Sequence, residues 1–175
     1  EINGGGCNFV DDAKTQKPVI KIEGTVKKTP RIGGVMGYHS TYVSGANCAS
    51  LQNLTNYADI QYNTVAGSTN QSSVGGILGH INGTMVFKNC VNNGDLTIEK
   101  DAKYVGGIAA SYINGAKYSL ADWANLTNNG NIIAKSATET NGPWFAGILP
   151  RTKSTPAVVW KNMHNNGDIT VGPNI

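Results

Sequence analysis

Polar and apolar residues alternate over several short segments of the chain. Residues 95–98 read Asp-Leu-Thr-Ile, and residues 168–171 read Asp-Ile-Thr-Val. Residues 60–62 and 132–134 stand at the same place in their copies and follow this alternation less strictly. Because an alternation with a period of two puts successive side chains on opposite faces of a strand, each segment predicts a short β-strand with one buried face.

A column of large apolar residues precedes these segments. Its members stand 36, 36 and 37 residues apart: Leu51, Phe87, Trp123 and Trp160. The residue that follows each of them, such as Lys88 or Lys161, suits an outward position. Large apolar side chains at a repeat spacing predict a core column stacked inside an array, where neighbouring aromatic rings also attract one another.

Two phrases recur at nearly the same spacing. The first reads Asn-x-x-Asn-Asn-Gly-Asp-aliphatic and occupies residues 53–60, 89–96, 125–132 and 162–169, with Tyr-Ala replacing Asn-Gly in the first copy. The second is a Gly-Gly-aliphatic phrase that begins at residues 33, 75 and 106 and recurs as Ala-Gly-Ile at residue 146. Self-similarity at a period of roughly 20–50 residues is typical of a stacked array in which each unit covers the hydrophobic face of the next.

We therefore predict an all-β chain folded as a parallel β-solenoid, a β-helix-like stack of about four repeats of about 36 residues with three strands each. The repeats cover approximately residues 32–62, 74–98, 105–134 and 145–171 of an array that spans 32–175. Residues 1–31 are expected to form an N-terminal capping segment with a degenerate repeat.

The first asparagine of each phrase is expected at a bend. Stacked amides can bond one another there and form a structural ladder, with the members Asn53, Asn89, Asn125 and Asn162. The alternative for this column is a polar ligand track on the exterior.

The composition agrees with β-structure that is rich in turns. The chain has 22 glycines in 175 residues and only 14% charged residues, against about 25% in ordinary globular domains. The net charge of +3 is not arranged in a broad basic stripe, so binding to nucleic acid is not expected. No apolar run reaches about 18 residues, so no direct membrane span is expected.

Three cysteines, Cys7, Cys48 and Cys90, leave at least one thiol unpaired or joined outside the chain. Cys90 shares its column with two leucines and a methionine of the other copies, so it is predicted to be a small buried hydrophobe. Cys7 and Cys48 are either bridged to each other or free.

The two phrases together resemble the GLUG-type repeats of bacterial surface proteins, especially those of gut Bacteroidetes. The resemblance rests on residues 74–79, Val-Gly-Gly-Ile-Leu-Gly, followed by residues 89–96, Asn-Cys-Val-Asn-Asn-Gly-Asp-Leu, and it covers about residues 32 to 171. It implies a secreted or surface-anchored, adhesin-like protein with a β-solenoid fold. The family carries no catalytic motif that could be transferred to this chain.

Few carboxylates are placed where they can meet. Asp59, Asp95 and Asp168 align in one column, which Asn131 interrupts. Two carboxylates on adjacent turns could hold a cation or act as the acid–base pair of a polysaccharide-cleaving enzyme. The simpler interpretation is turn chemistry, in which each carboxylate bonds the local backbone. The three histidines do not align with one another, so no catalytic residue, metal site or cofactor is predicted.

Aromatic residues near the loops are the remaining candidates for binding. The loops after each Gly-Gly phrase cover residues 38–50, 80–85, 111–120 and 151–158 and are expected to project from one corner of the coil. With one residue from the loops that precede the phrases, they supply five candidate ligand contacts: Tyr38, Tyr42, Tyr112, Tyr118 and Trp144. Such rings suit the flat faces of sugars or a protein partner, although they could simply cover the corners of the coil.

The sequence thus favours a noncatalytic adhesion or recognition module, extracellular or on the cell surface. It would bind a glycan or a host or bacterial surface protein through several weak corner-loop contacts. The alternatives are a carbohydrate-active enzyme on a β-helix scaffold and a structural spacer. The open sheet edges at both ends of an array also predict adjoining domains or end-to-end self-association.

Overall fold

The structure is a computed structural model that describes residues 2–3, 17–26, 29–40, 49–66, 72–83, 85–100, 102–113, 122–135, 143–153 and 159–172. Every helix or strand found in these ranges is a β-strand. The strands form four sheets, here named A to D, and every pairing between them is parallel. The all-β, parallel β-solenoid predicted from the sequence is confirmed.

Sheets A and B contain the strands of the two repeated segments around the asparagine phrase. Sheet A consists of β1 (Ile2–Asn3), β5 (Ala49–Gln52), β6 (Thr55–Asn56), β10 (Met85–Asn92), β14 (Asp122–Asn128) and β18 (Val159–Asn165). Sheet B consists of β2 (Val19–Val26), β7 (Asp59–Ala66), β11 (Leu96–Ile98), β15 (Ile132–Ala134) and β19 (Ile169–Val171).

Sheets C and D contain the strands on either side of the Gly-Gly phrase. Sheet C consists of β3 (Arg31–Gly33), β8 (Ser73–Gly75), β12 (Tyr104–Gly106) and β16 (Trp144–Ala146). Sheet D consists of β4 (Met36–Ser40), β9 (Leu78–Asn82), β13 (Ala109–Ile113) and β17 (Arg151–Lys153).

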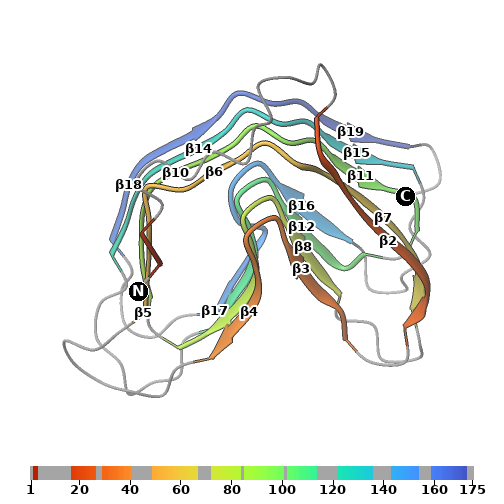
Figure 1. The fold of residues 1–175 in the computed structure, drawn as a ribbon, viewed down its shortest axis with the longest axis horizontal. Helices are drawn as coiled ribbons and strands as arrows, with labels where there is room; N and C mark the ends of the chain where they lie inside the picture. The colour runs from red at the N-terminus through yellow and green to blue at the C-terminus, as the bar shows by residue number, and fades with distance from the viewer. Residues whose placement is uncertain are drawn as a thin grey trace.

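Each coil runs through the sheets in the order A, B, C, D before the next coil begins. Sheets A and B form an arch, and sheets C and D form a wedge that rises into it (Figure 1). One hydrophobic cluster packs residues of sheet A, such as Phe87 and Trp123, against Leu78 and Ile81 of sheet D. A second cluster packs Ile60 and other residues of sheet B against sheet C. The fold therefore has two parallel cores with the wedge between them.

The strand register stacks equivalent residues of successive copies directly on one another. Phe87 pairs with Leu51 on one side and with Trp123 on the other, and Trp123 pairs with Trp160. In the first coil, β2 pairs with β7 along its whole length, so the stack reaches back to Val19 and includes the Gly24-Thr25-Val26 segment. The inference that copies lie on top of one another along a common axis is confirmed.

The number of strands in each coil differs from the prediction. We expected the Gly-Gly phrase to form one narrow strand, which gave three strands in each repeat. Instead the phrase is a bend that separates a strand of sheet C from a strand of sheet D, and it forms the tip of the wedge (Figure 1). The bend is tight: a Cβ added at Gly75 would lie 2.1 Å from the carbonyl oxygen of Leu78, three residues further on.

Candidate functional site

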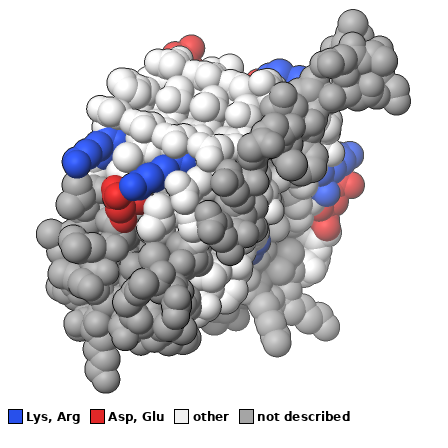
Figure 2. Space-filling model, turned by 60° about the vertical axis from the view of Figure 1, so that its left-hand side comes forward, with Lys and Arg blue, Asp and Glu red and all other residues white. Residues whose placement is uncertain are grey.

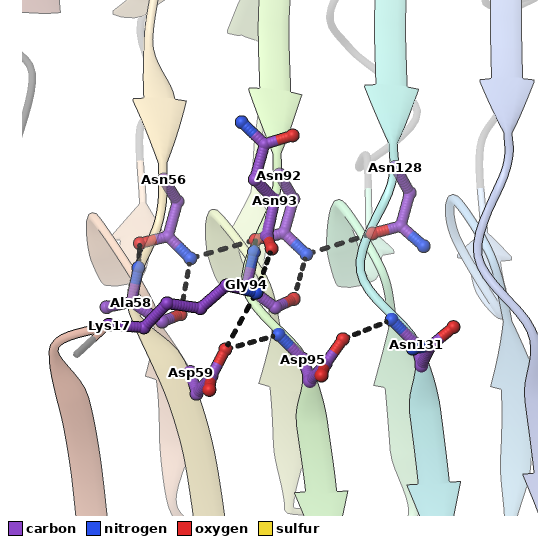
Figure 3. Close-up of polar contacts among 10 residues, drawn as sticks. All are labelled: Lys17, Asn56, Ala58, Asp59, Asn92, Asn93, Gly94, Asp95, Asn128 and Asn131. Atoms are coloured by element: carbon purple, nitrogen blue, oxygen red, sulfur yellow. Dashed lines mark hydrogen bonds and ion pairs between the residues drawn. The ribbon is translucent and has the colours of Figure 1, made fainter. Parts of the chain in front are cut away.

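A column of asparagines, buried in all but its last member, lies where the chain passes from sheet A to sheet B (Figure 3). Its members are the second asparagines of the repeated phrase: Asn56, Asn92, Asn128 and Asn165. The Asn56 amide donates to Asn92 Oδ1 at 2.8 Å, Asn92 donates to Asn128 Oδ1 at 2.9 Å, and Asn128 donates to Asn165 Oδ1 at 2.8 Å. Each amide also donates to the carbonyl oxygen two residues ahead, as Asn92 does to Gly94 at 2.8 Å. The inner ladder thus joins the coils and closes a turn within each coil.

The tip of the wedge presses directly on this inner ladder. A Cβ added at Gly76 would lie 2.4 Å from Asn92 Cγ, and one added at Gly107 would lie 2.3 Å from Asn128 Cγ. Any side chain at these glycines would clash with an amide and with the backbone of the next coil. This contact explains why the Gly-Gly phrase and the asparagine phrase recur together.

The asparagine column named from the sequence forms a second, exposed ladder. Asn53, Asn89, Asn125 and Asn162 have φ angles of 56°, 53°, 55° and 53°. Asparagine is the side chain that most readily tolerates this left-handed conformation, which bends each strand of sheet A. The amides bond along the stack, with Asn125 donating to Asn89 Oδ1 at 2.7 Å and Asn162 donating to Asn125 Oδ1 at 2.8 Å.

The aspartate column is a third ladder. Asp59 Oδ1 accepts the backbone N–H of Asp95 at 2.8 Å, and Asp95 Oδ1 accepts that of Asn131 at 2.7 Å (Figure 3). Asn131 Oδ1 in turn accepts the backbone N–H of Asp168 at 3.0 Å. The carboxylates therefore bond the backbone of the following coil, whereas the sequence suggested the local backbone. Among the described residues no three His, Cys, Asp or Glu side chains gather where they could hold a metal ion.

Two residues named from the sequence have surroundings that differ from the expectation. Tyr112 was named as a candidate ligand contact, but its side chain is fully buried and its ring lies 5.3 Å from that of Trp123. The prediction was wrong because β13 turns this side chain into the core between sheets A and D. Trp160 was named as a core residue, but it is 39% exposed because it belongs to the last coil of the stack.

Cys90 is buried and free, as its column predicted. Burial raises the pKa of its thiol to about 11, partly offset by backbone hydrogen bonds from Leu54 and Asn53. Such a thiol is an inert core group at neutral pH. Tyr42, Tyr118, Cys7 and Cys48 lie outside the described residues.

Tyr38 and Trp144 are the two candidate ligand contacts that are exposed, by 43% and 51%. They belong to two columns that line the inside of the wedge. The sheet C column contains Arg31, Ser73, Tyr104 and Trp144. The sheet D column contains Tyr38, His80, Ser111 and Arg151. We call these eight residues the arginine–aromatic seam.

Each of the two arginines of the seam lies on an aromatic ring. The Arg31 guanidinium lies 4.1 Å from the centre of the Tyr38 ring, and that of Arg151 lies 4.6 Å from the centre of the Tyr104 ring. Tyr38 stacks on His80 with ring centres 5.6 Å apart. Within the described part of the chain, neither guanidinium has a carboxylate partner. Two cations therefore lie on aromatic faces, and no carboxylate of the described ranges neutralises them.

The electrostatic field of the seam acts on His80. Burial, together with the positive charges of Arg31 and Arg151, lowers the pKa of His80 to about 4. His80 is consequently neutral at physiological pH and the two arginines carry the positive charge. The buried Ser111 hydroxyl has no hydrogen-bond partner among the described residues. The seam thus offers two cations and two exposed rings, which suit an anionic ligand with flat apolar faces.

The outer side of sheet A has a different character. Figure 2 shows this side, and uncharged residues cover most of the described surface in the view. The Lys88 ammonium is paired with the Asp122 carboxylate there. A third asparagine column adds to the amides on this side, with Asn129 donating to Asn93 Oδ1 at 2.8 Å. This amide-rich face is therefore a weaker candidate for an anionic ligand than the seam.

Sequence reasoning missed the inner ladder and most of the seam. The inner ladder had a clear signal, since its four asparagines repeat at steps of 36, 36 and 37 residues within the phrase. The seam had none, because its columns hold a different residue in every coil. Only the start of each corner loop, at Tyr38, His80, Ser111 and Arg151, pointed toward it.

Comparison with family models, with curated proteins and with solved structures gives no match for this chain. The resemblance to GLUG-type repeats therefore rests on the two phrases alone. Throughout the described ranges, no helical segment has the length and apolar character needed to cross a membrane.

Proposed function

We propose that this protein is a noncatalytic recognition module of the cell surface or extracellular space that binds acidic glycans along the arginine–aromatic seam. The observation that carries the proposal is the pair of guanidinium groups on Tyr38 and Tyr104, neither of them neutralised by a described carboxylate. Arginine forms paired hydrogen bonds with carboxylate and sulfate groups, and exposed rings stack on sugar faces.

The spacing of the two cations favours an extended ligand. Arg31 belongs to the first coil and Arg151 to the fourth, so three strand spacings of about 4.8 Å place them about 14 Å apart along the axis of the stack. A chain of several sugars that carries repeated negative charges could contact both cations. Affinity would then come from several weak contacts acting together.

An enzyme on the same scaffold is less well supported. The aligned carboxylates Asp59 and Asp95 each accept a hydrogen bond from the next coil, which accounts for their position without catalysis. A structural spacer is the second candidate, and the four stacked ladders that stiffen the coil favour it. A spacer would need no free cations on the seam.

The proposal is tested with an array of neutral, carboxylated and sulfated glycans, followed by calorimetric titration with the best ligand. Arg31→Gln and Arg151→Gln should each weaken binding by about 10- to 100-fold, the worth of one charge-assisted hydrogen bond of about 1.5–3 kcal/mol. Lys88→Gln is the matched control, because it removes the same charge from the outer side of sheet A. Binding should also weaken with added salt.

Two results would count against recognition at the seam. Absence of binding to every glycan would favour the spacer. Equal losses for Arg31→Gln and Lys88→Gln would mean that net charge, rather than the geometry of the seam, attracts the ligand.

A further inference from the structure

Three Asn-Gly pairs lie where the chain passes from sheet A to sheet B. They are Asn93-Gly94, Asn129-Gly130 and Asn166-Gly167, one in each of the last three copies of the asparagine phrase. Asparagine is a thermolabile residue, and it is most reactive before glycine, because no side chain shields the backbone nitrogen that attacks it. Asn129 and Asn166 are exposed and Asn93 is half-buried, so burial does not keep water from these amides.

Deamidation at such a pair needs no reactant other than water. The glycine nitrogen attacks Cγ of the asparagine, a cyclic imide closes, and the amide nitrogen leaves as ammonia with the proton of the glycine N–H. Water then opens the imide. Cleavage of the new bond between the nitrogen and Cγ gives aspartate. Cleavage of the original peptide bond gives isoaspartate, whose main chain runs through Cβ and Cγ and is longer by one methylene group.

The structure holds the attacking nitrogen in place. The Gly94 N–H donates to Asn92 Oδ1 at 3.3 Å, and the Gly94 carbonyl accepts from the Asn92 amide at 2.8 Å (Figure 3). A single side chain of the inner ladder therefore fixes the peptide groups on both sides of this glycine. The Gly130 carbonyl accepts from the Asn128 amide in the same way, at 2.7 Å.

Each glycine also packs tightly on the coil before it. A Cβ added at Gly94 would lie 1.9 Å from the Ala58 carbonyl oxygen, and one added at Gly130 would lie 1.9 Å from that of Gly94. A Cβ added at Gly167 would lie 2.0 Å from the Gly130 carbonyl oxygen. Only a hydrogen atom fits on this side of each glycine, so its peptide groups cannot rotate toward the preceding side chain.

The side chains that would react are held as well. Asn129 Nδ2 donates to Asn93 Oδ1 and Asn166 Nδ2 donates to Asn129 Oδ1, both at 2.8 Å. The Asn129 backbone N–H donates to the Asn92 carbonyl of the preceding coil at 2.8 Å. These bonds direct the amides along the stack, whereas closure of the imide requires Cγ to turn back onto the following nitrogen.

We propose that Asn93, Asn129 and Asn166 are latent deamidation sites, which the contacts of the following glycines keep unreactive in the folded coil and which unfolding releases. The isoaspartate product cannot return to the stack. Its extra methylene group would have to fit between an asparagine and a glycine that both pack on the preceding coil. Prolonged unfolding thus becomes an irreversible chemical change. The proposal rests on the ladders and is independent of glycan binding.

The test incubates the whole protein at mildly alkaline pH, in native buffer and in guanidinium chloride, and measures deamidation by peptide mass spectrometry. In native buffer the three sites should react at least about a hundredfold more slowly, because only a very small fraction of an ordinary domain is unfolded at any time. At intermediate denaturant concentrations the rates should follow the unfolded fraction measured by circular dichroism. A native rate within about a hundredfold of the unfolded rate would overturn the proposal.

Asn92→Ala tests the local restraint, because it frees the Gly94 N–H and leaves Gly167 unchanged. Circular dichroism confirms that the variant is folded. In native buffer the rate at Asn93 should rise at least about threefold more than the rate at Asn166, which corresponds to the loss of one hydrogen bond. Equal rises at the two sites would mean that global unfolding alone controls the reaction, and the role of the glycine contacts would be rejected.

Refolding tests the consequence of the reaction. Protein kept in denaturant until the sites have reacted should lose the ability to refold on dilution in proportion to its isoaspartate content. The matched control combines Asn93→Gln, Asn129→Gln and Asn166→Gln, because the longer side chain closes an imide far more slowly. Both proteins keep the other Asn-Gly pairs of the chain, so the control should refold to a clearly greater extent after the same incubation. Equal refolding of the two proteins would contradict the proposal.

Discussion

Truncation of one amide of the inner ladder should destabilise the protein far more than truncation of its sequence neighbour. The Asn128 amide nitrogen donates to Gly130 O at 2.7 Å and to Asn165 Oδ1 at 2.8 Å. Asn128 Oδ1 accepts from Asn92 at 2.9 Å. Asn128→Ala removes all three hydrogen bonds at a site that is almost completely buried.

The magnitude follows from the groups that are left without partners. The Asn92 amide and the Gly130 carbonyl remain buried, whereas Asn165 is exposed and can bond water. Each buried unsatisfied group costs about 1–3 kcal/mol, so the free energy of unfolding should fall by about 2–6 kcal/mol. A loss of this size is a large fraction of the total stability of an ordinary domain, about 5–15 kcal/mol.

Asn129→Ala is the matched control, because it changes the same residue type at the next position. Asn129 donates to Asn93 Oδ1 and accepts from Asn166, both at 2.8 Å, but this ladder is exposed and water can replace the lost bonds. We expect a change of about 0.5 kcal/mol or less. Urea unfolding followed by tryptophan fluorescence and circular dichroism measures both variants and tests whether the two signals coincide. Equal losses for Asn128→Ala and Asn129→Ala would refute the reasoning.

Two further predictions concern the turns and the seam. A Cβ at Gly130 would lie 1.9 Å from the Gly94 carbonyl oxygen, so Gly130→Ala should lower the free energy of unfolding in urea by about 1–3 kcal/mol or more. In the first copy this position is Ala58, and its backbone accommodates the side chain. The reverse substitution there, Ala58→Gly, should lower the free energy of unfolding by only about 0.5–1 kcal/mol. The pKa of His80 should be about 4 by NMR titration, below the ordinary 6.5, so its contribution to stability is complete above pH 6.5 and is lost as the pH falls toward 4. His80→Gln should remove this pH dependence, and a normal pKa in the unmodified protein would contradict the burial of the ring.

The sequence predicted the stack because the ladders require the same residue in successive coils. An asparagine that bonds the asparagine above and below it must recur once in every coil. The spacing of Asn53, Asn89, Asn125 and Asn162 therefore equals the number of residues in one coil. Large residues in the core column recur for a similar reason, since each packs on its equivalent. Spacing alone thus identified which residues lie on one another.

Spacing could not reveal how the coil bends within one repeat. The Gly-Gly pair reads equally well as a strand interior and as a turn, and only the contact between Gly107 and Asn128 requires the bend at the wedge tip. The same bend determines where the following side chains point. Tyr112 pairs with the buried Ile81, and this apolar equivalent was the one sign in the sequence that the ring belongs to the core.

The positions that do not repeat are those where the fold leaves the choice of residue open. A ladder position bonds its own equivalent, so a change in one copy disturbs its neighbours in the coils on both sides. A seam position packs across the wedge instead, and the second coil combines the small Ser73 with the larger His80 while the third combines Tyr104 with the small Ser111. The scaffold therefore tolerates different seam residues in every coil, provided that the two sheets of the wedge still fit together. Specific binding requires such non-repeated chemistry, which is the physical reason to look for it at the seam rather than on the ladders.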